Sequence, residues 1–284
     1  MTGLPRRAVL RWMAACAAVA GARAIAAEPA TPSLPDVAQI VARNASARGG
    51  LEGWRRVQTM AWEGHVEGAG PQRQKLSFVL EQKRPGFARF ELNTSGQKSV
   101  RVFDGTHGWK LRPDASGQAE VQPYSDDELR FARGAQVIDG PLMDYAAKGS
   151  DITLAGMADA DGGRAYVLDV RPPEGGHHRV WVDAESFLEL RHEREFRNGQ
   201  GQMARATVFY RNYRNIDGLM LPLAIETGDA PGAAQHRLVI DNVALNPVLD
   251  DRSFGKPTPP AAHRRGVVVD TRAAASAGAM RVAQ

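Results

Sequence analysis

The chain has 284 residues, of which 43% are hydrophobic and 24% charged, so it can bury a core and lacks the composition of a disordered protein. Nine of its 36 basic residues lie in the first 26 and the last 30 positions, together with one of its 32 acidic residues. The stretch between carries 27 basic and 31 acidic residues, which argues against a basic surface for nucleic acid.

The first 26 residues are typical of an export signal. Arg6-Arg7 and Arg11 precede a charge-free run from Trp12 to Ala22, and Ala24-Ile25-Ala26 has the small-x-small pattern of a cleavage site. The run is too short to span a membrane, and the paired arginines resemble the twin-arginine signal. We therefore predict that residues 1–26 are removed near Ala26 and that the mature protein is periplasmic.

The chain has one cysteine, Cys16, and it lies inside this signal. Cleavage near Ala26 leaves a mature protein without disulfides, thiol nucleophiles or cysteine metal ligands. The alternative is cleavage before Cys16, as in a lipoprotein, which would leave Cys16 as an acylated anchor.

After a linker at residues 27–35, the pattern predicts two short helices. Asp36 is a good N-cap, and apolar residues recur at helical spacing from Val37 to Ala45, up to the Gly49-Gly50 stop. A second helix is expected from Leu51 to Val57.

From residue 60 onward, apolar residues alternate with polar ones, which is typical of half-buried antiparallel strands. Turn pairs such as Asp104-Gly105 and Asp217-Gly218 separate these stretches about every ten residues. The fold class predicted is mainly β, with about ten strands in a single curved antiparallel sheet or barrel. The strands are expected within residues 60–66, 76–80, 88–92, 99–103, 108–111, 152–155, 165–171, 178–182, 188–197, 203–211, 219–226 and 237–243.

One interruption of the strand pattern predicts further helices. Ser125 and Glu128 form a capping box, so a helix of about two turns should follow through Leu129 and Phe131. A second short helix is expected over Leu142–Tyr145. Apolar helices between strands must bury their faces, and the concave side of a curved sheet is the natural place.

The titratable clusters predict no catalytic residue, no metal ligand and no cofactor. His177 and His178 point to opposite faces if they lie on a strand, and no third ligand is evident. The run from His192 to Glu195 lacks the spacing of a zinc hydrolase and is expected on a solvated strand face. No nucleophile elbow, phosphate loop or dinucleotide fingerprint is present.

Large aromatic residues are distributed over the predicted strands, one or two per strand. A curved sheet would gather several of them, either as ordinary core or as the lining of a cavity for an apolar ligand. The residues expected to line such a cavity are Trp62, Phe78, Phe90, Trp109, Trp181 and Tyr210.

The final residues, 255–284, are rich in Pro and Ala and carry five basic residues. They predict a disordered basic tail after Phe254.

Several short segments, read in order, resemble the LolA-like outer-membrane lipoprotein-sorting family. The resemblance covers residues 37 to 254, and it depends on the order and spacing of fragments that are individually short. These fragments are Ala47–Gly53, Phe103–Trp109, Asp139–Tyr145 with Lys148-Gly149, Val182–Glu185, Tyr213–Pro222, and Leu245–Pro247 with Asp250–Phe254.

The resemblance implies an unclosed β-barrel whose concave face is covered by helices acting as a lid. The helices expected at 36–48 and 126–132 would supply this lid, with Leu129 and Phe131 facing the ligand. The family carries acyl chains of lipoproteins or lipids across the periplasm. The resemblance therefore implies lipoprotein or lipid acyl chains as ligand and inner- and outer-membrane transfer partners. We expect a monomer.

From these arguments we expect residues 36–254 to form one domain that shields an acyl chain and is not an enzyme. Two alternatives remain open. An envelope sensor would detect lipid in the same pocket and act through a protein partner. An enzyme of another kind would place a titratable pair with perturbed pKa values inside the cavity.

Overall fold

The computed structural model describes residues 34–68, 76–94, 97–114, 117–135, 138–197, 202–228 and 236–259. The predicted export signal, most of the predicted linker and nearly all of the predicted tail lie outside these residues. The residues from Pro35 onward belong to one unit, and the description below concerns that unit alone.

A single antiparallel sheet of thirteen strands dominates the unit, in the order β6-β5-β4-β3-β2-β1-β13-β12-β11-β10-β9-β8-β7. It is not closed, because β6 and β7 are its two edge strands. The mainly β, unclosed architecture confirms the predicted fold class, with β6 as a strand that the sequence pattern did not indicate. The strands are β1 Thr59–Gly68, β2 Leu76–Lys83, β3 Phe87–Thr94, β4 Gln97–Asp104, β5 Gly108–Pro113, β6 Ala119–Pro123, β7 Asp151–Ala160, β8 Gly163–Arg171, β9 His177–Asp183, β10 Glu189–Arg197, β11 Met203–Ile216, β12 Leu219–Thr227 and β13 His236–Leu245.

The helices are α1 Val37–Ala47, α2 Leu51–Arg55, α3 Asp126–Ala135 and a 3-10 turn, η1, Asp251–Phe254. Asp36 accepts from the backbone N of Gln39 at 2.7 Å, which confirms it as the N-cap of α1. The capping box before α3 is also confirmed, because the Ser125 backbone N donates to Glu128 at 2.9 Å and the Glu128 N donates to Ser125 at 3.3 Å.

The predicted helix at Leu142–Tyr145 is wrong. Residues 138–149 form a series of hydrogen-bonded turns, which we call the turn segment, and Asp144 adopts a left-handed backbone with φ of 53°. This conformation breaks a helix, since residues other than glycine rarely adopt it. Two ion pairs hold Asp144 and Asp139 in this arrangement, Arg55 to Asp144 at 2.7 Å and Lys148 to Asp139 at 2.7 Å.

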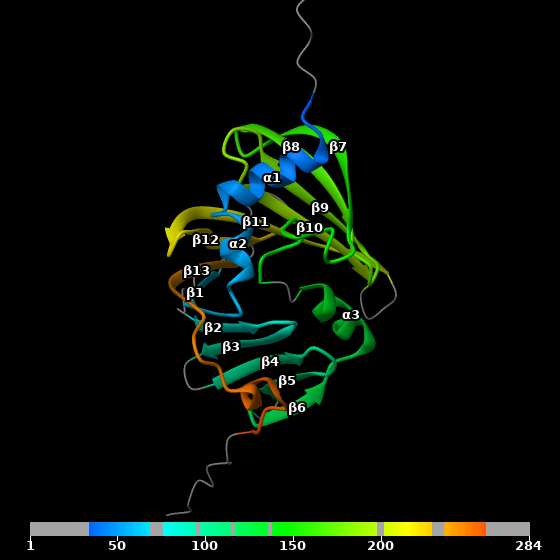
Figure 1. The fold of residues 1–284 in the computed structure, drawn as a ribbon. Helices are drawn as coiled ribbons and strands as arrows, with labels where there is room; N and C mark the ends of the chain where they lie inside the picture. The colour runs from blue at the N-terminus through cyan, green and yellow to red at the C-terminus, as the bar shows by residue number, and fades with distance from the viewer. Residues whose placement is uncertain are drawn as a thin grey trace, which may run out of the picture. The chain divides into compact units, whose positions relative to one another are not determined.

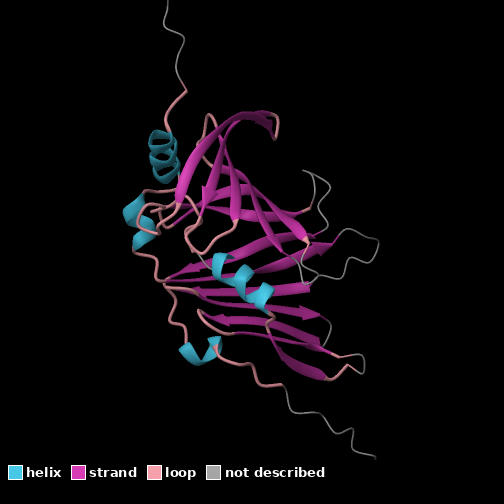
Figure 2. Cartoon of the chain, turned by 90° about the vertical axis from the view of Figure 1, so that its right-hand side faces the viewer, coloured by secondary structure: helices cyan, strands magenta, loops and turns pink. Residues whose placement is uncertain are grey.

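Helices α1, α2 and α3 lie on the concave side of the curved sheet (Figures 1 and 2). We call this the inner face. Trp54 of α2 and Met143 of the turn segment pack on Trp62 and Phe78 of the sheet, and Ile40 of α1 packs on Val180. Burial of these apolar side chains, at about 25 cal/mol per Å², is what fixes the helices to this face.

The opposite side, which we call the outer face, is built differently. Under η1, Phe254 packs on Val100, Val102 and Leu111. Elsewhere on this face charged side chains from neighbouring strands pair with one another, as in Arg179 of β9 with Asp169 of β8 at 2.7 Å.

Candidate functional site: a cavity on the inner face

A cavity of about 600 Å³ opens on the inner face, where α3, the turn segment and strands β9, β10 and β11 meet. Val208 and Tyr210 enter it from β11, because alternate residues of a strand share one face. Phe131 of α3 and Pro141 of the turn segment also line it, together with Pro172 and Pro173, which follow β8. The walls are therefore apolar over much of their extent.

The same cavity also has a polar lining. It consists of Arg84, Lys148, Ser150, Glu174, His178, His192 and Arg194. Glu174 is the one carboxylate among the described lining residues. An apolar pocket with a few convergent polar groups is the usual form of a site for a small molecule.

Asp139 holds the turn segment over the sheet. Its carboxylate accepts from Arg84 at 2.9 Å and from Lys148 at 2.7 Å, and its backbone carbonyl accepts from Arg48 at 2.8 Å. Arg48 also pairs with Glu189 at 3.1 Å, and both side chains are at most 7% exposed. This buried network ties α1, the turn segment and β10 together beside the cavity.

A pair of neutral histidines lies on the cavity floor. His192 Nε2 is 3.2 Å from His178 Nδ1, so one imidazole donates to the other. Burial lowers the pKa of His178 to about 4, with the charges of Arg194 and His177 adding to the effect. Burial also lowers the pKa of His192, and the charge of His178 acts in the same direction. Near neutral pH neither ring carries a charge.

Two sets of contacts hold α3 at the cavity. Glu128 pairs with Lys110 at 2.8 Å and with Arg101 at 3.1 Å. Burial opposes ionisation of this carboxyl, but these hydrogen bonds lower the pKa of Glu128 to about 2. At the other end, Arg194 donates to the backbone carbonyl of Phe131 at 2.9 Å, and its guanidinium lies 4.1 Å from the centre of the Phe131 ring.

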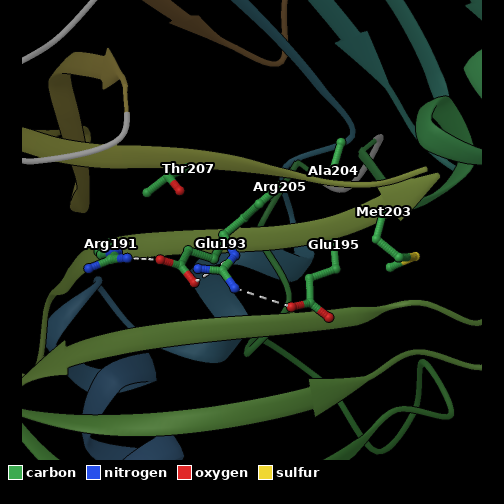
Figure 3. A pocket seen from close by; sticks show the side chains of 7 residues that line it. All are labelled: Arg191, Glu193, Glu195, Met203, Ala204, Arg205 and Thr207. Atoms are coloured by element: carbon green, nitrogen blue, oxygen red, sulfur yellow. Dashed lines mark ion pairs between the residues drawn. The ribbon is translucent and has the colours of Figure 1, made fainter. Parts of the chain in front are cut away.

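A second hollow, of about 420 Å³, lies on the outer face between β10 and β11 (Figure 3). Its charged side chains form ion pairs with one another: Arg191 pairs with Glu193, and Arg205 lies 3.7 Å from Glu193 and 3.5 Å from Glu195. The pairing leaves no surplus of either sign for a charged ligand. The inner cavity is therefore the better candidate site.

No group of three or more His, Cys, Asp or Glu side chains is placed to hold a metal ion anywhere in the described part of the chain. None of the described helices is long and apolar enough to cross a membrane.

Solved structures share this architecture. A LolA superfamily protein from Nitrosomonas europaea superposes with a TM-score of 0.51 at 18% identity, over 78% of this chain and 99% of that protein. This chain has the LolA-like fold. The result confirms the resemblance inferred from the sequence fragments, and at this identity it establishes the fold alone.

Two further structures match a similar share of the chain. A DUF1329 family protein from Desulfovibrio piger has a TM-score of 0.49 at 16% identity, covering 78% of this chain and 98% of that one. An outer membrane lipoprotein-sorting protein domain from Vibrio parahaemolyticus has a TM-score of 0.48 at 13% identity, covering 77% and 95%. No family model matches the sequence, and no curated protein matches it.

Within this LolA-like fold, four of the six aromatic residues singled out from the sequence lie on the inner face. Trp62 and Phe78 belong to the core beneath α2 and the turn segment, and Phe90 stacks on Phe78 with 5.9 Å between ring centres. Tyr210 lines the cavity. In the predicted lid, Phe131 lines the cavity, whereas Leu129 is partly buried and is not among its lining residues.

Trp109 and Trp181 lie on the outer face, so their expected place in the lining is wrong. Trp109 is directly opposite Val102, which packs beneath Phe254 of η1. Trp181 packs on Ala165 and Val167, and the guanidinium of Arg191 lies 4.2 Å from its ring centre. Residues directly opposite in an antiparallel pair share a face, so neither indole reaches the inner side.

The expectation of a solvated face for residues 192–195 is also wrong. His192 and Glu193 are only 8% and 5% exposed, and they point to opposite faces of β10. His192 and Arg194 line the inner cavity, whereas Glu193 and Glu195 line the outer hollow. The strict alternation within this strand was the signal that could have separated the two sets.

Proposed function

We propose that this protein is a carrier that binds the acyl chain of a lipid or lipoprotein in the inner cavity and shields it from water. The observation that supports this most directly is the apolar wall of Phe131, Val208 and Tyr210 around a cavity of about 600 Å³ on the helix-covered face of a LolA-like fold. Sites for small ligands are commonly about 300–1,000 Å³ in volume. Each buried methylene would contribute about 0.8 kcal/mol to loading.

The proposal includes the setting in which the carrier works. The predicted signal at residues 1–26 supports export to the periplasm, and residues 36–254 would act as one monomeric domain without a cofactor. Handover would require displacement of α3, because Phe131 forms part of the cavity wall. Transfer partners at the inner and outer membranes would receive the ligand at that step.

One observation favours an enzyme as a second candidate function. His178 and His192 form a titratable pair with lowered pKa values inside the cavity, as an enzyme would require. Within the described residues, neither ring is hydrogen-bonded to a hydroxyl or a carboxylate, so no base-activated nucleophile is assembled. The carrier therefore remains the function that the geometry supports best. If the wild type released a cleaved product from a bound ligand and His178→Gln did not, the enzyme would become the better supported function.

The test of the carrier function is native mass spectrometry of the protein purified from periplasm without detergent, with solvent extraction in parallel. We expect a co-purifying acylated species of defined mass. An apo mass that stays unchanged after incubation with lipids and lipopeptides would contradict the proposal.

A matched pair of variants locates the ligand. Ala206 lines the inner cavity and Thr207, its neighbour on β11, lines the outer hollow. Ala206→Trp should fill the cavity and abolish the bound species, whereas Thr207→Trp should retain it. Equal ligand content in both variants would place the ligand elsewhere.

A further inference from the structure

Arg194 has an unusual environment for a partly buried cation. Its guanidinium has five N–H donors, yet Phe131 O, at 2.9 Å, is the one acceptor that the described residues provide. The Nε atom is buried and has no hydrogen-bond partner in the described residues. The described residues place no carboxylate within 4.0 Å of this guanidinium; Glu174, which lines the same cavity and also lies beside Gly134, acts on it only through space. Burial lowers the pKa of Arg194 to about 10, so the group is still charged near neutral pH.

The cavity is shaped around this guanidinium. Gly134 of α3 faces it so closely that a Cβ added there would lie 2.8 Å from Arg194 Nη2. Arg194 also lines an adjoining hollow of about 310 Å³, which shares Phe131, Glu174 and His178 with the cavity. The charge therefore lies at the junction of two accessible spaces.

The other side of the cavity adds further positive charge. Arg48, Arg84 and Lys148 are three cations that share two carboxylates, those of Asp139 and Glu189. Burial lowers the pKa of Lys148; Asp139 opposes this shift, and the charges of Arg84 and Arg48 add to it. Arg84 and Lys148 both line the cavity. The polar part of the lining thus carries a surplus of cations over anions.

A partly buried cation without a carboxylate partner is costly, and a ligand that supplies a negative charge reduces that cost. The outer face shows that this sheet can neutralise its arginines where no ligand is needed, since Arg205 has both Glu193 and Glu195. Among the described residues, the lining of the inner cavity combines this surplus with apolar walls.

We propose that the inner cavity selects amphiphiles with an anionic headgroup, a phosphate or a carboxylate, which Arg194 and Lys148 bind while the acyl chain contacts Phe131, Val208 and Tyr210. This proposal rests on the proposed carrier function and narrows its ligand class. A neutral acylglycerol or an uncharged acylated peptide would satisfy the apolar wall but leave Arg194 unpaired.

The test compares ligands that share one oleoyl chain: oleate, oleoyl lysophosphatidate and the neutral monooleoylglycerol. Binding to the delipidated full chain is measured by titration calorimetry, with glycerol 3-phosphate as a chain-free phosphate. We expect both anionic amphiphiles to bind at least about tenfold more tightly than the neutral one, since a charge-assisted hydrogen bond contributes about 1.5–3 kcal/mol. Glycerol 3-phosphate should bind weakly, because it lacks the chain.

Variants test whether Arg194 causes the preference for anionic amphiphiles. Arg194→Gln should weaken binding of the anionic amphiphiles about tenfold more than binding of the neutral one, and Arg194→Lys should restore part of this difference. Arg205→Gln, on the outer face, is the matched control and should have no effect. Lys148→Gln provides a second variant if Arg194→Gln does not fold.

Three outcomes would overturn the inference, and they are distinguishable. Equal binding of the neutral and anionic amphiphiles would leave the carrier function intact and remove the anion site. Tight binding of glycerol 3-phosphate would indicate a phosphate site that needs no chain. Failure of all the amphiphiles to bind would contradict the proposed function itself.

Discussion

The two faces of this sheet use similar residues for different purposes. Both carry tryptophans and arginines, and on both a guanidinium lies over an indole, Arg48 on Trp54 inside and Arg191 on Trp181 outside. Outside, in the hollow between β10 and β11, two arginines pair with two carboxylates and the charge is balanced. Inside, helices and the turn segment bury the apolar residues, and the remaining space is a cavity with surplus cations. The same residue type is therefore ion-paired on one face and lines a cavity on the other, depending on its neighbours on adjacent strands and helices.

The largest expected effect is on the packing of the inner face. Trp54 is fully buried and donates from Nε1 to Arg48 O at 2.9 Å. Trp54→Ala should lower the free energy of unfolding by about 3–5 kcal/mol, because it leaves a cavity beneath α2. The half-buried Trp109 of the outer face is the comparison. In urea denaturation, Trp109→Ala should lower the free energy of unfolding by less than half as much as Trp54→Ala. Equal losses would mean that the two faces contribute alike to the core.

The next effect comes from the buried ion pair of Arg48 with Glu189. Glu189→Gln removes one charge and leaves the Arg48 guanidinium in a site where its partner was 5% exposed. We expect a loss of about 3 kcal/mol in unfolding free energy, since the remaining buried charge has no carboxylate of its own. A change below about 1 kcal/mol, the usual value for exposed pairs, would contradict the role given to this pair.

A pH dependence of intermediate size should follow from the histidine pair. His178 has a folded-state pKa of about 4 against an ordinary value of 6.5, so the unfolded chain binds the proton more readily between these values. The contribution to stability is present above pH 6.5 and is lost as the pH falls toward 4. The wild type should lose about 3 kcal/mol more than His178→Gln over this window. His236→Gln, at an exposed position of β13, is the control and should lose as much stability over this window as the wild type.

The smallest effect is expected for a single member of the outer charge network. Arg237 is 44% exposed and lies 3.5 Å from Glu67 and 3.6 Å from Glu226. Arg237→Ala should change the unfolding free energy by less than about 1 kcal/mol. A loss comparable with that of Glu189→Gln would show that the outer network is cooperative and would remove the contrast between the faces.

Local signals in the sequence predicted most of the fold. The capping residues Asp36 and Ser125 mark the starts of α1 and α3, because their side chains satisfy backbone donors a few residues away. Period-two alternation located twelve of the thirteen strands. The turn segment could not be predicted in this way, since its conformation depends on Arg55 and Arg84, which lie far away in the sequence.

The lining of the site was harder to predict than the strands. In β9, Val180, Trp181 and Val182 are all apolar and all buried. The sequence pattern therefore does not indicate which of them point to the inner face. Trp109 is on the outer face because Phe254, far along the chain, covers that side. Arg194 looked like part of a solvated strand, and only its cross-strand partner Ala206 and the overlying α3 place it in the cavity.

The most direct test of the central claim, that the inner face binds an acyl chain, is photolabelling with a long-chain fatty acid that carries a diazirine in its chain. Strand β11 provides an internal control because it has residues on both faces. Ala206, Val208 and Tyr210 line the cavity, and Thr207 and Phe209 face outward. We predict that tandem mass spectrometry will locate the label on the inward set and on Phe131. Label on Thr207 and Phe209, or spread equally over both sets, would contradict the account.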